Sequence, residues 1–313
     1  MRKTSFKYAR CILLNLALFF LLSVGSGCMS TKQFPSPDTV SIDNGKYKVE
    51  LVLPETALND KILGCRFIKA GWMTSLTIQN KDKSVELFKT DSLWPNYASF
   101  GCPQEFTPAI PLSSDGSYVE ALRVGAGVVR YKPNDPLHAE IVERFAWQTT
   151  FKPNGDGLAI INSQSTGVKG ILNGYGYNFS HEIVIKHNSP SILLRQKLEN
   201  TGSKRIQTSN YMHPFFECGP DVKYAIGKKT FIPVAKQKNA TLLSGNDFEV
   251  SSTWVSVKFN NNLQCRISSD KKLSKVILWK MSKKKCFAVE PFVDLNLQPG
   301  ETANWTWEIK TRQ

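Results

Sequence analysis

Apolar and polar residues alternate along most of the chain, and the helical repeat of about 3.6 residues is nearly absent. Residues 47–53, for example, place Tyr, Val, Leu and Leu at every second position. This pattern is typical of strands that bury one face, and a polar turn at 80–83 joins two of them as a hairpin. Further strands are expected at 73–78, 84–88, 118–124, 139–150, 158–163, 175–186, 191–199, 204–213, 252–259, 263–267, 276–280, 286–290 and 302–310.

Many closely spaced strands without intervening helices predict an all-β fold, a large antiparallel β-sandwich. Residues 45–313 contain no repeat and no convincing linker, so we expect them to form one domain. Residues 91–116 are rich in aromatic residues, proline and glycine, which predicts a loop. A loop of this length inside a compact domain is uncommon unless it is functional, so it is expected to line a cleft.

The N-terminus predicts export. Four Lys and Arg residues precede an apolar run at 11–24, which is too short for a comfortable membrane span, so residues 1–27 are expected to be a signal peptide. Small residues followed by Cys28 resemble the bacterial lipobox, in which the cysteine is acylated; ordinary cleavage with Cys28 incidental is the alternative. Residues 28–44 would then be a polar tether. The predicted location is the bacterial cell envelope, with the membrane reached through Cys28 and the leaflet left open.

The net charge of +14 is unevenly distributed. Four of these charges lie in residues 1–27, whereas residues 201–313 hold 18 Lys and Arg against 9 Asp and Glu. A basic surface of this kind fits an acidic glycan or anionic lipids, and a solvated lysine face is the alternative. Nucleic acid is excluded as a partner because an exported chain without a binding motif does not fit it. The oligomeric state is left open.

The cysteines indicate no metal site. Beyond Cys11 and Cys28 the chain has an odd number of them, at spacings too wide for a zinc motif, and their pairing is left open. They are Cys65, Cys102, Cys218, Cys265 and Cys286.

Two residues are candidates for proton transfer. His213 closes the expected strand 204–213, and histidine is the side chain whose ordinary pKa lies nearest neutrality. The alternative is a half-buried histidine satisfied by a neighbouring carbonyl. Glu290 precedes Pro291, which is expected to end its strand and leave the carboxylate either in a cleft or at a capped strand end.

These segments resemble the aldose 1-epimerase, or galactose mutarotase-like, family. The strand after Asn200-Thr201-Gly202 that ends in His213 is similar to the segment with the catalytic histidine of that family. Glu290, eight residues before the Gln-Pro-Gly-Glu turn that begins at Gln298, is similar to its catalytic glutamate. Residues 64–76 and 124–128 resemble an uncharacterised, lipoprotein-type branch of epimerase-like proteins.

The resemblance implies the β-supersandwich fold and an enzyme that interconverts the anomers of a sugar. The implied partner is a mono- or oligosaccharide, and no cofactor or metal is expected. Glu290 would act as base and His213 as acid across a sugar-sized gap, and their roles would exchange when the ring closes. The expected sugar contacts are the polar side chains of Arg66, Glu105 and Asp221 and the aromatic faces of Trp94, Tyr97 and Phe215. The alternative is an ion pair for Arg66 and core packing for the aromatic residues.

The chain also departs from the family. It lacks the second histidine in a His-Gly motif, and His138 lies in an expected loop; His181 is expected to be structural. Two other functions are therefore kept open. One is a catalytically inactive carbohydrate-binding lipoprotein on the same fold, and the other is a glycan-cleaving enzyme that uses Tyr97 or Tyr211.

Overall fold

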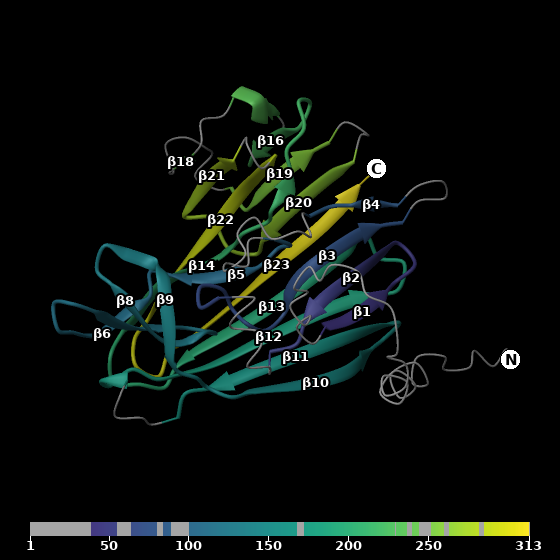
Figure 1. Ribbon diagram of the computed structural model, residues 1–313. Helices are drawn as coiled ribbons and strands as arrows, with labels where there is room; N and C mark the ends of the chain where they lie inside the picture. The colour runs from purple at the N-terminus through teal and green to yellow at the C-terminus, as the bar shows by residue number, and fades with distance from the viewer. Residues whose placement is uncertain are drawn as a thin grey trace, which may run out of the picture. The chain divides into compact units, whose positions relative to one another are not determined.

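Antiparallel strands form nearly all of the regular secondary structure among the described residues (Figure 1). The computed structural model describes residues 39–54, 64–79, 84–88, 100–167, 172–228, 230–236, 240–243, 252–259, 263–281 and 285–312. Residues 1–27, predicted to be a signal peptide, as well as Cys28, Trp94 and Tyr97, lie outside these residues, and the statements made about them stay predictions. The described residues all fall in one compact unit, Ser36–Gln313.

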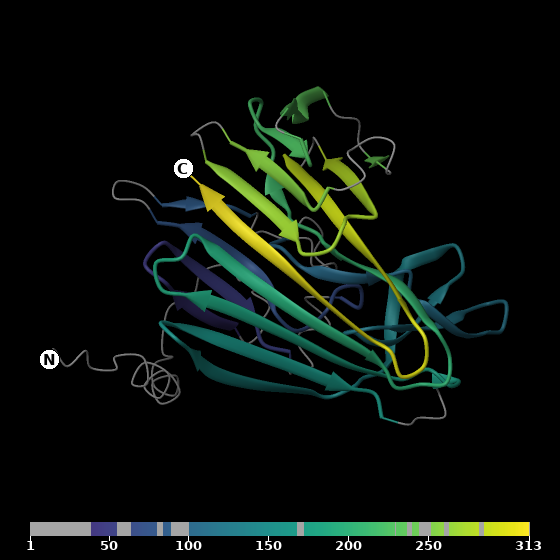
Figure 2. The same ribbon diagram turned by 180° about the vertical axis from the view of Figure 1, so that it is seen from behind.

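The largest sheet, called here the β23 sheet, has nine strands in the order β10-β11-β12-β13-β23-β20-β19-β16-β17. Figure 2 shows this sheet from behind, with β23 in yellow. Its strands are β10 (Trp147–Asn154), β11 (Gly157–Ser165), β12 (Tyr177–Lys186), β13 (Ser191–Asn200), β23 (Thr302–Arg312), β20 (Gln264–Ser269), β19 (Trp254–Lys258), β16 (Lys223–Ile226) and β17 (Ile232–Pro233).

A second sheet, called here the β14 sheet, has six strands in the order β18-β21-β22-β14-β5, with β15 also paired to β22. Its strands are β18 (Ala240–Leu243), β21 (Lys275–Met281), β22 (Cys286–Leu297), β14 (Ile206–Met212), β5 (Gln104–Thr107) and β15 (Phe216–Glu217). A short 3-10 helix, η2 (Val234–Lys236), lies between β17 and β18.

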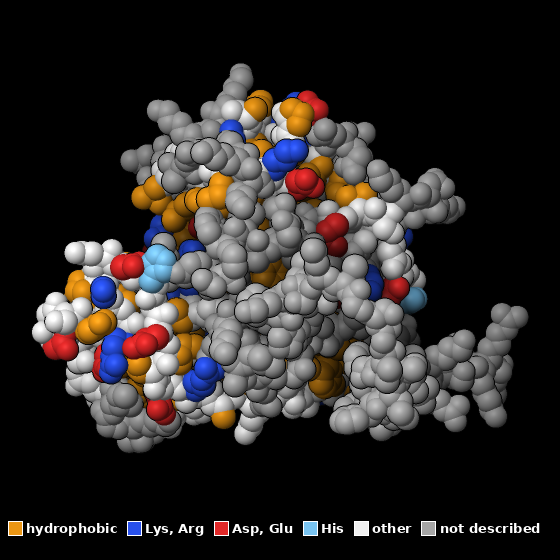
Figure 3. Space-filling model, in the orientation of Figure 1, with side chains coloured by type: hydrophobic (Ala, Val, Ile, Leu, Met, Phe, Trp, Pro, Cys, Tyr) orange, Lys and Arg blue, Asp and Glu red, His pale blue; other side chains and the backbone are white. Residues whose placement is uncertain are grey.

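Two four-stranded sheets complete the fold. The first contains β1 (Thr39–Asp43), β2 (Tyr47–Val52), β3 (Trp72–Ile78) and β4 (Val85–Glu86). The second contains β6 (Ile110–Ser114), β7 (Val119–Arg123), β8 (Gly127–Lys132) and β9 (Asp135–Glu143). Acidic and basic side chains are interspersed on the second of these sheets, at the left of Figure 3, where Arg130 and Glu120 form an ion pair of 2.7 Å.

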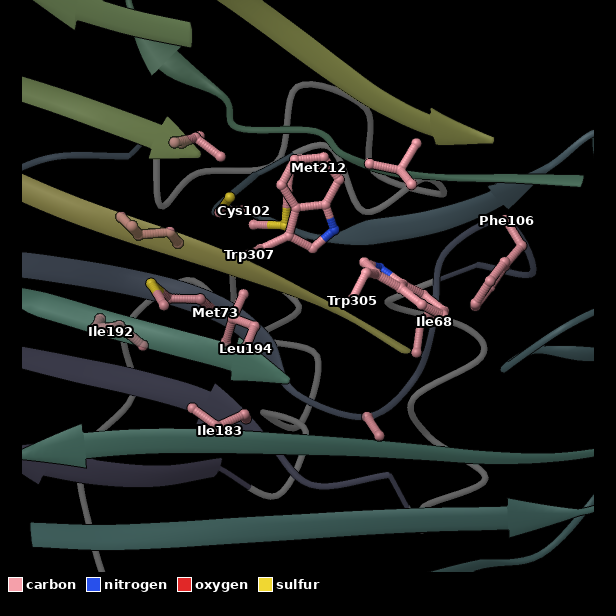
Figure 4. Close-up of a cluster of buried hydrophobic side chains, with 14 of the residues drawn as sticks. Ile68, Met73, Cys102, Phe106, Ile183, Ile192, Leu194, Met212, Trp305 and Trp307 are labelled. Carbon is pink, nitrogen blue, oxygen red and sulfur yellow. The ribbon is translucent and has the colours of Figure 1, made fainter. Parts of the chain in front are cut away.

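The β14 and β23 sheets share one hydrophobic core, and a buried amide links them. Trp305 and Trp307 of β23 lie in the same cluster as Met212 of β14 and Phe106 of β5 (Figure 4). Both indole N–H groups donate to Asn210 Oδ1, at 3.0 and 2.8 Å. Since Asn210 is on β14, one side chain satisfies two buried donors of the facing sheet.

The expected all-β antiparallel sandwich is confirmed, and most expected strands lie within a few residues of their predicted bounds. Several expectations about local structure are wrong. The expected loop 91–116 contains β5 and β6, and the expected strand 139–150 is divided between β9 and β10. The expected tether does not extend to residue 44, because β1 already pairs with β2 through the alternating residues Val40 and Ile42.

Pro291 does not end its strand, contrary to expectation, because β22 continues to Leu297. Ser274 N–H donates to Phe292 O at 2.9 Å, so the backbone polar groups of Phe292 face β21. Because the backbone polar groups of successive residues in a strand point to opposite edges, those of Pro291 face the edge of β22 that pairs with β14. On that edge the ladder with β14 stops at the pair of Phe292 with Tyr211, so the missing N–H of Pro291 costs no ladder bond.

No disulfide joins the described cysteines. Within the described parts of the chain, no helix combines the length and the apolar character needed to cross a membrane.

The amide of Asn210 is predicted to be a large source of stability. Asn210→Ala leaves two buried indole donors without their acceptor, and each such group costs about 1–3 kcal/mol. We expect the free energy of unfolding, measured in urea, to fall by roughly 2–4 kcal/mol. Asn178→Ala, which removes an exposed amide of β12 bonded to Glu199, is the control and should change it by less than about 0.5 kcal/mol. Equal effects of both variants would contradict the proposed link between the sheets.

Candidate active site

Three neighbouring strands of the β14 sheet carry the candidate catalytic residues. Tyr211 of β14 lies opposite Glu105 of β5 on one side and opposite Phe292 of β22 on the other. Side chains two positions apart on a strand share a face. His213 follows β14 two positions after Tyr211, and Glu290 lies two positions before Phe292. The strand register therefore brings these side chains to one face of the sheet.

His213 and Glu290 are in direct contact. The distance from His213 Nε2 to Glu290 Oε1 is 3.1 Å, and the two side chains are 5% and 6% exposed. The expectation of a sugar-sized gap between them is therefore wrong. The gap was expected because acid and base were assigned to opposite sides of the sugar, whereas adjacent strands hold the two groups side by side.

The imidazole is fixed from several directions. Its ring stacks on Phe215 at 4.2 Å between centroids, and Phe67 meets it edge-on at 5.7 Å. The backbone N–H of His213 donates to Pro103 O at 2.9 Å. Phe215, predicted as a platform for the sugar, is itself buried and packs against the imidazole instead. Phe215 lies two residues after His213, in the short connection between β14 and β15, and packs on the ring of the histidine.

Arg66, Glu105 and Tyr211 form a bonded cluster beside this pair. Arg66 Nε donates to Glu105 Oε2 at 2.6 Å, and its Nη2 lies 2.7 Å from the Tyr211 hydroxyl. The same hydroxyl donates to the Glu105 carboxylate. Arg123 Nη1 lies 3.9 Å from the other Glu105 oxygen. Arg66 is 32% exposed and Glu105 is 5% exposed, so the ion pair runs from the surface toward the buried carboxylate.

Burial favours the neutral form of both members of the His213–Glu290 pair. It lowers the pKa of His213 well below its usual range, and the positive charge of Arg66 lowers it further. Burial raises the pKa of Glu290 to about 8, although the Arg66 charge acts against this shift and the Glu105 charge adds to it. At neutral pH the site therefore holds a protonated carboxyl beside a neutral imidazole, the reverse of a charged base and a charged acid.

The arrangement can donate one proton and accept another at adjacent positions. The Glu290 hydroxyl is the donor, and His213 Nε2 is the acceptor it faces at 3.1 Å. His213 Nδ1 has no hydrogen-bond partner among the described residues, so no neighbour there fixes the tautomer. Burial also raises the pKa of Tyr211 well above its usual range, which keeps the phenol protonated and a donor to Glu105.

The remaining predicted residues lie elsewhere. Asp221 is exposed on the turn between β15 and β16 rather than in the Arg66–Glu105–Tyr211 cluster. His138 lies on strand β9 and not in a loop, and its side chain is 58% exposed. His181 is fully buried, with Nε2 2.9 Å from Gln104 Nε2, and burial lowers its pKa to about 4. These contacts agree with the structural role predicted for His181.

The sequence predicted Arg66 and Glu105 but not their bonds to Tyr211. Tyr211 was considered only for a glycan-cleaving enzyme. Its position two residues before His213, within the expected strand 204–213, is the signal that places it on the same face. Nothing in the sequence indicated that Arg123 lies near Glu105, because only the fold brings β7 near β5.

Cavities lined by described residues, of about 590 and 400 Å³, lie over the β23 sheet and include no member of the His213–Glu290 pair. No group of three or more potential metal ligands occurs among the residues that the structure describes.

Comparison with known proteins identifies the fold. No protein-family model and no curated protein sequence matches the chain. Among solved structures, the Slr1438 protein of Synechocystis sp. PCC 6803 matches with a TM-score of 0.59 and 13% identity, over 91% of this chain and 99% of that one. A galactose mutarotase-like protein from Clostridium acetobutylicum matches with a TM-score of 0.58 and 12% identity, over 88% and 95%. A protein from Escherichia coli K12 that is provisionally assigned as an aldose 1-epimerase matches with a TM-score of 0.55 and 12% identity, over 88% and 99%.

The chain therefore has the β-sandwich fold of the aldose 1-epimerase and galactose mutarotase-like proteins, as the sequence resemblance implied. At these identities the likeness establishes the fold, and the chemistry has to be argued from the side chains.

The neutral form of Glu290 gives a testable pH dependence of stability. The native carboxyl has a pKa of about 8 against an ordinary value of 4.5, so folding retains a proton that the unfolded chain releases between these values. Stability from this group is complete below the unfolded pKa and is lost as pH rises through the folded one. Glu290→Gln keeps the shape and removes the titration. Between pH 4.5 and about 8, the free energy of unfolding of the variant should therefore rise relative to that of the wild type by at most about 1.4 kcal/mol per pH unit.

Urea unfolding of both proteins at a series of pH values measures the difference, in which the titration of His213 largely cancels. A difference that does not change with pH would show that Glu290 is ionised in the folded protein.

Proposed function

We propose that this protein is an aldose 1-epimerase-type enzyme that interconverts the anomers of a sugar by opening and closing its ring. The observation that carries the proposal is the buried contact of 3.1 Å between His213 Nε2 and Glu290 Oε1. In a cyclic sugar, the ring oxygen and the anomeric hydroxyl are bonded to the same carbon. A donor and an acceptor that lie side by side can therefore reach both oxygens at once, without a gap between them.

The proposed step moves two protons. The Glu290 carboxyl gives its proton to the ring oxygen while His213 Nε2 takes the proton of the anomeric hydroxyl. The bond from the anomeric carbon to the ring oxygen breaks, and the anomeric C–O bond becomes a carbonyl. The site then holds a carboxylate beside an imidazolium, whose charges stabilise each other at short range. After rotation of the carbonyl, the same transfers in reverse close the ring on the other face.

These starting roles reverse those that the family resemblance implied. Burial outweighs the charge of Arg66 at Glu290, and both keep His213 neutral, so Glu290 begins as the acid and His213 as the base. Each proton transfer of this kind supplies about 10²- to 10⁴-fold in rate.

Arg66 is the proposed contact between the pair and the sugar. Its guanidinium is partly exposed, whereas His213 and Glu290 are nearly covered, so a sugar that approaches the pair meets this cation. The bonds to Glu105 and Tyr211 hold the guanidinium in place, and its remaining N–H groups can donate to sugar hydroxyls. Its charge also lowers the pKa of Glu290, which helps the carboxyl to release its proton.

A non-catalytic carbohydrate-binding protein is the second candidate. It is favoured by the near-complete burial of both His213 and Glu290, because a sugar must come close to groups that are only 5% and 6% exposed. A glycan-cleaving enzyme that uses Tyr211 as a base is disfavoured, since burial raises the pKa of this phenol and its proton is donated to Glu105.

Anomer exchange distinguishes the enzyme from the binding protein. NMR exchange spectroscopy on a panel of neutral and acidic sugars should show acceleration by the wild type. His213→Gln and Glu290→Gln should each reduce it by about 10²- to 10⁴-fold while sugar binding is retained. His138→Gln is the control, because His138 is exposed on β9. If the wild type binds a sugar but accelerates anomer exchange for none of the sugars on the panel, the protein is a binding protein instead.

Arg66 should set the pH at which activity is lost. Arg66→Gln removes a charge that lowers the pKa of Glu290, so the alkaline limb of the rate profile should move to higher pH. Arg66→Lys keeps the charge and should leave the limb nearer its original position. Arg130→Gln, which breaks an exposed pair with Glu120, is the matched control and should not move it. An unmoved limb in Arg66→Gln would contradict the protonated Glu290 acid.

A further inference from the structure

The outer face of the β23 sheet bears a basic cavity that the proposed reaction does not use. The cavity has a volume of about 590 Å³ and lies over β16, β19, β20 and β23. Its lining consists of Gly227, Phe231, Trp254, Gln264, Arg266, Lys310 and Arg312. Figure 2, the view opposite to that of Figure 1, shows these strands. The volume falls within the range of small-molecule sites, about 300–1,000 Å³.

Strand register concentrates three cations at this place. Arg266 of β20 lies directly opposite Lys310 of β23, and the neighbouring pair is Gln264 with Arg312. Because residues two positions apart share a face, all four side chains point to the side away from the core residues Ile267 and Ile309. Like charges directly opposite each other on neighbouring strands destabilise a sheet, so this arrangement requires a compensating group.

The described residues provide no direct ionic partner for these cations. No ion pair joins Arg266, Lys310 or Arg312 to a carboxylate within the described parts of the chain. Glu308 is the acidic residue next along β23, and its two oxygens accept from Ser191 Oγ at 2.7 Å and Ser268 Oγ at 3.5 Å. Burial lowers the pKa of Arg266, the charge of Arg312 lowers it further, and the charge of Glu308 acts in the opposite direction.

Arg266 also has an unused donor. Its guanidinium carbon lies 4.0 Å from the centroid of the Trp254 ring, which fixes the plane of the group. Its Nε is buried and has no hydrogen-bond partner among the described residues. A half-buried arginine that packs on an aromatic ring and lines the cavity is suited to bind a carboxylate through its guanidinium group.

The other lining groups favour a sugar over a bare ion. Phe231 and the edge of Trp254 offer apolar surface, which the C–H faces of sugar rings can cover. Gln264 Nε2 is already used in a bond of 2.8 Å to Ser256 Oγ, so its carbonyl oxygen is left to accept from a hydroxyl. Cations, an amide oxygen and aromatic surface together match a ring that carries both a carboxylate and hydroxyl groups.

We propose that this cavity is a second binding site, specific for an anionic saccharide whose sugar rings carry carboxylate groups. It is separate from the His213–Glu290 pair and does not depend on the reaction proposed there. In this way the basic last third of the chain acquires a function as a glycan contact, instead of being only a solvated lysine face.

Isothermal titration calorimetry tests the proposal with trigalacturonate as the probe and uncharged maltotriose as its neutral counterpart. Trigalacturonate should bind, and its affinity should fall as salt is added. Lys310→Gln and Arg312→Gln should each weaken binding about fivefold, and the double variant more. Lys272→Gln removes the same charge from an exposed position that does not line the cavity and should leave the affinity unchanged.

Lys310 and Arg312 are partly or fully exposed, so these variants are expected to fold, which thermal unfolding verifies. Three results would overturn the proposal: equal binding of maltotriose, binding of inorganic phosphate as tight as that of trigalacturonate, or binding of vesicles with anionic phospholipid in place of the saccharide. A loss of affinity in Lys272→Gln equal to that in Lys310→Gln would also overturn it, because the effect would then come from net charge alone.

Discussion

The ladder between β14 and β22 stops at the pair of Tyr211 with Phe292 and resumes when β15 joins β22 at Phe287. In this interval the chain after β14 keeps backbone hydrogen bonds to the segment before β5, from His213 N–H to Pro103 O and from Phe215 N–H to Gly101 O, and His213 lies beside Glu290. Pro291 fits at this point because its missing N–H faces the interrupted edge. The contact of 3.1 Å between imidazole and carboxyl is thus a consequence of strand pairing, held by rigid elements on both sides.

Burial then decides what this contact can do. Burial favours the neutral forms of both ionisable groups, so the Glu290 carboxyl stays protonated and the His213 imidazole keeps an unprotonated nitrogen that can accept a proton. Arg66 acts on both groups from a position that solvent can reach: its charge lowers the pKa of Glu290, which opposes burial, and lowers that of His213, which adds to burial. The site therefore combines a buried proton-transfer pair with an accessible cation, and the bonded Glu105 and Tyr211 connect that cation to the strands of the pair.

Alternation of apolar residues was sufficient to predict the fold class and most strands, because one face of nearly every strand is buried. The resemblance selected His213 and Glu290, and the structure brings them together. Sequence could not reveal that β22 continues through Pro291, since this depends on which edge of the strand is unpaired. Nor could it reveal β5, a short strand inside an aromatic-rich stretch, which places Glu105 beside Tyr211. The protonation state also escaped prediction, because it depends on burial and not on residue type.

The central claim is that Glu290 is a protonated acid beside a neutral imidazole, and infrared difference spectroscopy of the wild type against Glu290→Gln tests it most directly. The account predicts a carbonyl band of a protonated carboxyl at neutral pH, which is absent from the variant and disappears as pH rises through the Glu290 pKa of about 8. A spectrum with only carboxylate bands for Glu290 at neutral pH would contradict it, since the pair would then be an ion pair.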